Sequence, residues 1–181
     1  MVGAAPRIVR ATPADLPAIE RIARLTWPET FKGILSTDQI AYMLDRMYRP
    51  AALTAQLAQG HVFDLLLDAD RTTDDYSGQT GMRYRPVGYV SHELDYAPGI
   101  TKIHKLYLLP GAQGQGFGRL LIDHVARAAR RAGQQHLRLD VNYQNSAVDF
   151  YSYLGFAKIG RFDTDIGEGY LMEDWRMERP L

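Results

Sequence analysis

The segment that most constrains the fold is residues 106–122, LYLLPGAQGQGFGRLLI. An apolar stretch ends at Pro110, glycines follow at positions 114, 116 and 118, and an amphipathic stretch continues to Ala132. This order predicts a strand, a tight turn and a helix. Glycine lets backbone N–H groups approach a ligand closely, and a helix N-terminus favours an anion, so the turn fits a pyrophosphate. A tight connection that binds no ligand explains the glycines equally well.

The remaining segments predict alternating strands and helices in one domain, residues 1–181. Strands are expected at 7–11, 61–67, 87–94, 102–109 and 137–141, and two more between 156 and 179. Helices are expected after Thr12-Pro13, after Ser36, after Pro50, at 118–132 and at 146–154. Residues 68–85 are polar and rich in turn formers, which indicates a long hairpin connection. This order favours an α/β or α+β fold with a mixed sheet.

Composition excludes several function classes. Lysine plus arginine number 21 and aspartate plus glutamate number 21, so no global positive field attracts nucleic acid or anionic lipid. The chain has no cysteine, which excludes a disulfide framework and a thiol nucleophile. No run approaches the roughly 18 apolar residues of a membrane span, and the N-terminus lacks a signal-peptide pattern. We therefore expect a cytoplasmic protein without a nucleic-acid or membrane partner.

The glycine turn does not match the common nucleotide motifs. It reads Gly-x-Gly-x-Gly followed by Arg119, whereas a dinucleotide fingerprint needs Gly-x-Gly-x-x-Gly and a phosphate-binding loop needs Gly-Lys-Ser/Thr. A Rossmann-like nucleotide binder is therefore the least favoured of the functions considered for this chain.

Two ordered motifs resemble the GCN5-related N-acetyltransferase family. Residues 113–118, QGQGFG, are similar to its Gln/Arg-x-x-Gly-x-Gly/Ala signature, and residues 147–156 contain its Ala-x-x-Phe-Tyr-x-x-x-Gly-Phe pattern. The resemblance implies a mixed, mostly antiparallel sheet of about seven strands flanked by helices. It also implies acetyl-CoA as the acetyl donor and a transfer that requires no metal. A noncatalytic acetyl-CoA sensor module is the alternative from another class.

The resemblance assigns the cofactor site to backbone groups. The fourth strand of the family bulges away from the fifth, and the pantetheine arm pairs with backbone exposed in the gap. The glycine turn and the following helix N-terminus hold the pyrophosphate. Asn145 stands two residues before Ala147, where the family often has asparagine three before, so Asn142 is a second candidate. The expected cofactor residues are Leu106, Tyr107, Leu108, Gln113, Gly114, Gln115, Gly116, Phe117, Gly118, Arg119, Asn142 and Asn145.

Three residues are expected to carry proton transfer. Tyr151 matches the family tyrosine that protonates the departing thiolate, although an aromatic residue on an apolar helix face also suits core packing. An ammonium must lose a proton before it attacks, and His104 or Glu93 could accept it directly or through water. A structural role explains either residue as well. The expected chemistry is direct transfer in a ternary complex.

The acceptor is expected to be a primary amine of a small molecule. Trp27, Thr30 and Phe31 align with one wall of the acceptor site of the family, and a buried aromatic plug explains them equally well. The chain resembles the bacterial polyamine acetyltransferase branch, and a protein or peptide N-terminus is the other acceptor considered. A homodimer is plausible for the family. Five carboxylates of the terminal hairpin could attract a cationic amine: Asp163, Asp165, Glu168, Glu173 and Asp174.

Overall fold

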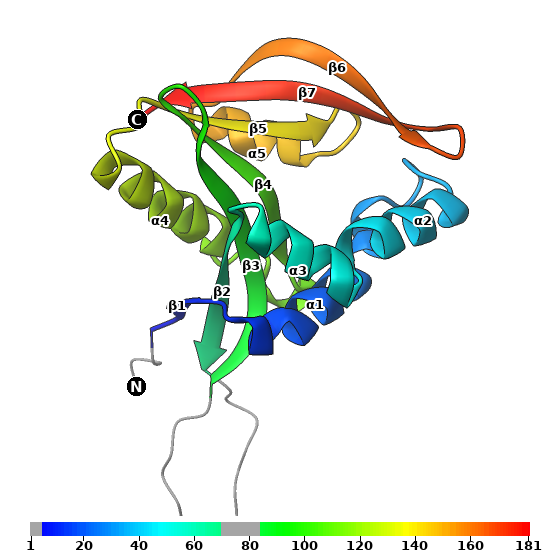
Figure 1. Ribbon diagram of the computed structural model, residues 1–181, viewed down its shortest axis with the longest axis horizontal. Coiled ribbons are helices and arrows are strands. Elements are labelled where there is room, and N and C mark those ends of the chain that lie inside the picture. The colour runs from blue at the N-terminus through cyan, green and yellow to red at the C-terminus, as the bar shows by residue number, and fades with distance from the viewer. Residues whose placement is uncertain (1–4, 70–83) are drawn as a thin grey trace, which may run out of the picture.

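A computed structural model describes residues 5–69 and 84–181. Its sheet has seven strands in the order β1-β2-β3-β4-β5-β7-β6 (Figure 1). Within the described residues, β4 and β5 are the one parallel pair and the other neighbours are antiparallel. The predicted mixed, mostly antiparallel sheet is confirmed. The strands are β1 (Arg7–Arg10), β2 (Val62–Ala69), β3 (Tyr84–Ala97), β4 (Ile100–Leu108), β5 (His136–Asn142), β6 (Ala157–Gly167) and β7 (Tyr170–Pro180).

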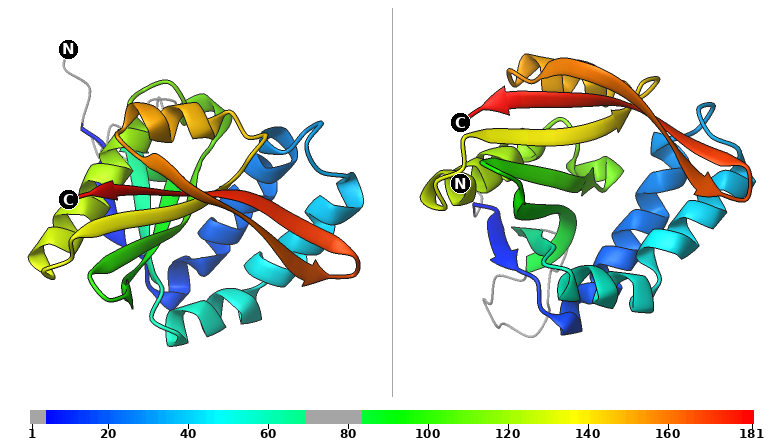
Figure 2. Two further views of the ribbon diagram at one scale, coloured as in Figure 1. Left: turned by 90° about the horizontal axis from the view of Figure 1, so that it is seen from above. Right: turned by 45° about the horizontal axis from the view of Figure 1, so that its top comes forward.

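Helices cover both faces of the sheet and enclose two hydrophobic cores (Figure 2). On one face lie α1 (Leu16–Thr30), α2 (Thr37–Tyr48) and α3 (Pro50–Ala58), and on the other lie α4 (Phe117–Arg131) and α5 (Ala147–Tyr153). Apolar residues recur three or four positions apart along α4, so one stripe of this helix is buried against the sheet. Among the described residues, no helix is long and apolar enough to cross a membrane.

The first helix begins differently from the prediction. Thr12 and Asp15 form a reciprocal capping box around a short 3-10 turn, Pro13–Asp15, and α1 begins only at Leu16. The proline at the first position is tolerated because its missing N–H has no partner at a helix start.

The predicted hairpin between the second and third strands is present as an antiparallel pair, β2 with β3. Most of the predicted connection, residues 70–83, lies outside the described residues.

The hairpin of β6 and β7 extends past the sheet and contacts α2 (Figure 1). The Tyr42 hydroxyl donates to the Ile166 carbonyl at 2.6 Å, and Gln39 Nε2 donates to the Leu171 carbonyl at 2.9 Å. The hairpin therefore forms one wall of the space between the sheet and the first helices.

Candidate active site

The sheet opens between β4 and β5. These strands pair only through residues 100–103 and 136–139, and beyond Ile103 and Leu139 they diverge (Figures 1 and 2). Leu106, Tyr107 and Leu108 remain paired with β3 on their other side. Their backbone edge that faces β5 therefore has no strand partner within the described residues. An extended ligand can pair with such an edge, as the predicted pantetheine site requires.

A β-bulge in β4 lies at the point where the sheet opens. Ser91 of β3 pairs with Lys105 and His92 pairs with Ile103, so His104 is the extra residue. Ile103 belongs to the core under α4, whereas Lys105 lies over aromatic rings of the opposite core. The bulge brings the side chains of His104 and Lys105 to the edge of the same cavity.

The glycine turn connects β4 to α4. Gly114 has a φ of 74° and Gly116 a φ of 79°, a region that side chains strongly disfavour. The amide of Gln113 donates to the Leu108 carbonyl at 3.2 Å, and the amide of Gln115 donates to the Gly111 carbonyl at 2.8 Å. These side chains thus hold the turn, and the glycines keep its backbone accessible at the N-terminus of α4.

Gly118 has a different reason to be glycine. A Cβ atom at this position would lie 2.9 Å from the Phe150 ring. The glycine therefore lets α4 pack closely against α5, which carries both Phe150 and Tyr151.

A cavity of about 1230 Å³ joins the glycine turn, the gap between the strands and the face that carries α1–α3. Its lining includes every predicted catalytic, cofactor-binding and acceptor-wall residue except Gln115 and Glu93. The structure thus brings together most of the predicted cofactor and acceptor residues, although the outermost of them, Trp27 and Asn145, lie 118 positions apart in the chain. Asn142 and Asn145 both line it, and each uses its side-chain oxygen to accept a backbone N–H of its own loop.

Tyr151 lies in the wall of this cavity. Its side chain packs between Phe150 and Phe156, with ring centroids 5.2 Å and 5.8 Å away, and 8% of the residue is exposed. Burial raises the pKa of Tyr151 to about 12, so the phenol stays protonated at neutral pH. The residue is both a core residue and a potential proton donor to the cavity.

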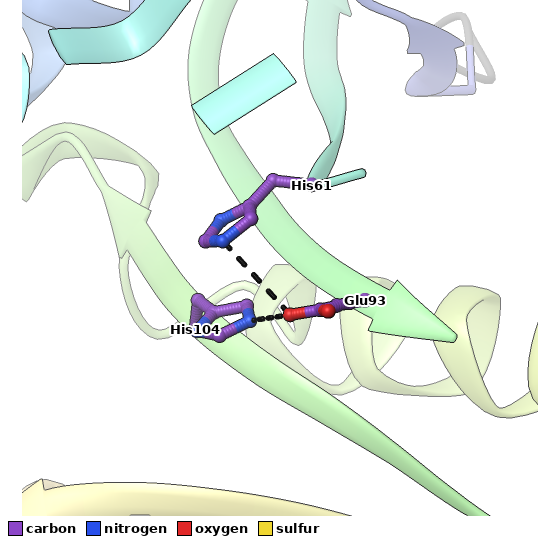
Figure 3. A group of neighbouring side chains, drawn as sticks. All are labelled: His61, Glu93 and His104. Atoms are coloured by element: carbon purple, nitrogen blue, oxygen red, sulfur yellow. Dashed lines mark hydrogen bonds and ion pairs between the residues drawn. The ribbon is translucent and has the colours of Figure 1, made fainter. Parts of the chain in front are cut away.

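His104 and Glu93 are neighbours, as Figure 3 shows, but only His104 lines the cavity. The neutral His104 ring donates from Nε2 to Glu93 Oε2 at 2.9 Å. Burial, together with His61 and Lys105, lowers the pKa of His104 to about 2. The ring therefore remains neutral, and its capacity to hold a proton is weak. Whether either residue acts as a base stays a prediction.

The predicted acceptor residues Trp27, Thr30 and Phe31 all line the cavity. Trp27 is also a core residue, since 2% of it is exposed and its ring lies 4.6 Å from Phe31 and 5.9 Å from Tyr107. The indole N–H donates to the Tyr48 hydroxyl at 3.3 Å. The geometry is thus compatible with both interpretations of these aromatic residues, a wall of the acceptor site and a buried aromatic plug.

Of the five carboxylates in the terminal hairpin, Asp174 is the one that lines the cavity. It faces Asn142 across the β5–β7 pair and is 8% exposed, and its carboxylate makes no hydrogen bond or ion pair with another described residue. Burial, reinforced by the charge of Asp140, raises the pKa of Asp174 to about 6. Asp140 also lines the cavity, but Lys102 and Arg176 neutralise it at 2.8 Å. Asp174 is therefore the buried carboxylate available to a ligand.

Lys105 is a cavity residue that the sequence did not reveal. Its ammonium donates to Gln56 Oε1 at 2.7 Å, and burial, together with Lys102, lowers its pKa to about 8. In the sequence it looks like an ordinary strand lysine. A β-bulge reverses which face of the sheet the following side chains occupy, and no local sequence pattern reveals such a bulge.

Comparison with known proteins identifies the family. The model of the acetyltransferase (GNAT) domain matches residues 75–171, which is more than half of the chain. The chain therefore belongs to the GNAT family of acetyltransferases. This confirms the family predicted from the two motifs, and it agrees with the predicted acyltransferase class and acetyl-CoA donor.

Individual relatives match parts of the chain. An uncharacterised N-acetyltransferase of Methanocaldococcus jannaschii is 32% identical over 78 residues, 40% of this chain and 34% of that protein. Streptothricin acetyltransferase of Streptomyces lavendulae is 38% identical over 72 residues, 39% of this chain and 38% of that protein. The matched part thus spans well under half the length of these curated relatives.

A solved structure matches almost the whole chain. The PaiA N-acetyltransferase of Thermoplasma acidophilum, in complex with coenzyme A, aligns with a TM-score of 0.74 and 21% identity. The alignment covers 98% of this chain and 100% of that one. At this identity the similarity establishes a shared fold.

Proposed function

We propose that this chain is an acetyl-CoA dependent N-acetyltransferase that transfers the acetyl group directly to a primary amine of a small cationic molecule. The observation that carries the proposal is the continuous cavity, which reaches from the glycine turn to Asp174. A donor site and an acceptor site that share one cavity suit transfer in a ternary complex.

The glycine turn and β4 suit the donor. Backbone N–H groups of residues 113–119 and the N-terminus of α4 would hold a pyrophosphate, and the free edge of residues 106–108 would pair with the pantetheine arm. A backbone N–H on this edge would also stabilise an oxyanion. When bound, acetyl-CoA supplies the thioester that makes the acetyl group reactive.

Tyr151 is the proposed proton donor. Its raised pKa keeps the hydroxyl protonated, and a thiolate that leaves inside a buried cavity needs a proton. Among the described residues no hydrogen bond holds the phenol, so the proton is available.

Asp174 is the proposed acceptor contact. Above a pH of about 6 its carboxylate is charged and attracts an ammonium, and a pKa near 6 also lets it accept a proton near neutral pH. His104, with a pKa lowered to about 2, accepts a proton far less readily. We therefore favour Asp174 over the pair of His104 and Glu93 as the base.

The first test is calorimetric titration with acetyl-CoA, with NAD and ATP as controls. We expect saturable one-site binding of acetyl-CoA alone. A screen for thiol release follows with spermidine, spermine, streptothricin, amino acids and peptide N-termini. Turnover confined to noncationic amines would reject the acceptor proposal, and binding without turnover of any amine would favour the sensor module. The cytoplasmic location, the homodimer and the single-domain organisation stay predictions.

A further inference from the structure

Three potential metal ligands meet beside the acceptor part of the cavity (Figure 3). His61 comes from the turn between α3 and β2, Glu93 from β3 and His104 from the bulge of β4. Their ligand atoms all lie within 4.8 Å of one another. Glu93 Oε2 is 2.9 Å from His104 Nε2 and 3.9 Å from His61 Nε2. Both imidazoles thus direct the same ring nitrogen toward one carboxylate oxygen.

Hydrogen bonding explains only part of this arrangement. The His104 ring is bonded to Glu93, but the His61 ring makes no hydrogen bond with another described residue, and its Nδ1 is buried without a partner. The two rings stack with centroids 4.0 Å apart. The other ring nitrogen of His61, Nε2, faces Glu93 Oε2 from 3.9 Å, which is too far for a hydrogen bond, so its lone pair is free to bind a ligand.

We propose that His61, Glu93 and His104 bind one divalent transition-metal ion, for which zinc is the best match. Two imidazole nitrogens and one carboxylate oxygen are a ligand set that zinc accepts, with open positions left for water. Tetrahedral ligands about 2.0–2.1 Å from zinc lie roughly 3.3 Å from one another. The distances of 2.9 Å and 3.9 Å to Glu93 Oε2 bracket this value, and all ligand atoms lie within 4.8 Å of one another. The two rings are stacked 16° from parallel, so they must turn out of the stack for both lone pairs to meet at one ion.

Access and charge permit an ion at this place. The three side chains are between 14% and 27% exposed, so the site is held by the sheet yet reachable from solvent. Lys102 and Lys105 are the nearby cations, and they oppose a metal ion. Lys102 is paired with Asp140 at 2.8 Å, and the Lys105 ammonium donates to Gln56 Oε1 at 2.7 Å. The carboxylate of Glu93 supplies the negative charge that the ion requires.

A second histidine–carboxylate group in the chain does not share these features. Asp64 lies 3.2 Å from His124 and 3.6 Å from His92, but the guanidinium of Arg10 already bonds this carboxylate at 2.8 Å. A bound cation would have to compete with the arginine. This group therefore provides an internal control.

The ion would touch the cavity through His104, the one ligand among the three that lines it. If the proposed transfer to a cationic amine is correct, a divalent charge at this wall opposes the ammonium. Metal binding itself does not depend on the proposed function, so it is tested without an activity assay.

The test is titration of the tag-free, metal-stripped protein with zinc chloride by calorimetry and with cobalt chloride by visible absorption. We expect one ion per chain. The variants His61→Ala, Glu93→Gln and His104→Ala should each weaken binding at least about tenfold, the lower end of the loss seen when even an outer partner of a metal ligand is removed. Thermal melting without metal checks that each variant is folded.

The matched control is His124→Ala, which removes a histidine of the group around Asp64 and should leave the zinc affinity unchanged. Absence of stoichiometric zinc and cobalt binding by the wild-type chain overturns the proposal without any variant. Binding that survives in all three ligand variants, or that disappears in His124→Ala, overturns it as well.

Discussion

The two ends of the cavity are built in different ways. The cofactor end consists of contiguous backbone, residues 113–118 and the start of α4, placed over a largely aliphatic core that also contains Phe117, Tyr151 and Phe156. The acceptor end consists of side chains from α1, α2, β4 and β7, placed over a core that contains Trp27, Tyr48 and Tyr89. A contiguous backbone site serves one unchanging ligand, whereas separately placed side chains can change with the acceptor.

The two ends of the cavity also differ in their electrostatics. At the acceptor end, burial raises the pKa of Tyr48 and Tyr107 well above the ordinary value, so both hydroxyls remain neutral. Asp174 and Lys105 are ionisable residues of this end, which Glu29, His104 and Asp140 also line. At the cofactor end, helix-terminal N–H groups supply the attraction for an anion. Changes at one end should therefore affect one ligand and leave the other almost unaffected.

The largest effect is expected at the cofactor end, from Gly116→Val. The φ of 79° disfavours a β-branched residue by about 1–2 kcal/mol, and the added side chain points into open space beside the turn. It would occupy the approach of a pyrophosphate. We expect calorimetry to detect no acetyl-CoA binding, while circular dichroism shows a folded chain.

Gly111→Ala is the matched control for this variant. Gly111 lies in the same turn, has no positive φ, and a Cβ there meets no atom within 4 Å. Its acetyl-CoA affinity should equal that of the wild type. An equal loss in both variants would mean that the whole turn is sensitive to substitution and that Gly116 has no particular role.

Tyr151→Phe should separate chemistry from binding. The phenol is proposed to protonate the thiolate, and general acid catalysis contributes about 10²- to 10⁴-fold. We expect kcat to fall within this range while the acetyl-CoA affinity changes little, because the ring still packs against Phe150 and Phe156. Parallel loss of kcat and affinity would assign Tyr151 to packing. Tyr143→Phe, outside the cavity lining, should leave both quantities unchanged.

The fold and the cofactor end could largely be predicted from the sequence. Hydrophobic periodicity indicates the elements, and the glycine turn and the segment around Tyr151 are contiguous motifs. The observed bounds differ from the predicted ones by one or two residues for β4 (Ile100–Leu108) and α4 (Phe117–Arg131), and by three at each end for β3 (Tyr84–Ala97). Such shifts are small because helix and strand ends are defined by local backbone geometry.

The acceptor end could be predicted only in part. Residues 163–174 of the β6–β7 hairpin include five acidic residues, and the sequence does not tell which of them points inward. Strand register decides this. Asp174 lies opposite Asn142 on β5, beside the gap, whereas the exposed Asp163 forms an ion pair with Arg161. The bulge that exposes Lys105 and the approach of His61 to His104 depend on strand pairing over long separations. No local pattern encodes such pairing.

Asp174→Asn should weaken binding of the amine acceptor without affecting binding of acetyl-CoA. A hydrogen bond to a charged group contributes about 1.5–3 kcal/mol, so KM for a cationic amine should rise about tenfold or more. Because the pKa is about 6, the wild-type KM should also rise as the pH falls below 6, and the variant should lack this rise. Steady-state kinetics from pH 5 to about 8 measure both effects.

The pKa shift also predicts the sign of the stability change caused by Asp174→Asn. Since folding raises the pKa of Asp174 from 3.8 to about 6, ionisation of this carboxylate destabilises the fold. Asp174→Asn should therefore be more stable than the wild type above pH 6, by up to about 3 kcal/mol, and gain nothing below about pH 4. The exposed Glu168→Gln in the same hairpin, which does not contribute to the raised pKa of Asp174, should change neither KM nor this pH profile. A pH-independent stability difference would contradict the buried, ionisable state of Asp174.

The smallest effect is expected from Ser36→Ala, at the start of α2. The Ser36 hydroxyl accepts the Gln39 N–H at 3.1 Å, and loss of such a cap costs about 1 kcal/mol, or about 2–4 °C in Tm. Because α2 contributes Gln39, Met43 and Tyr48 to the cavity, the cost should appear as a higher KM for the amine with unchanged acetyl-CoA affinity. Ser146, which precedes α5 at the cofactor end, makes no side-chain cap bond, so Ser146→Ala should leave Tm unchanged. If Ser36→Ala instead weakened acetyl-CoA binding as much as amine binding, the two ends of the cavity would be coupled through the sheet.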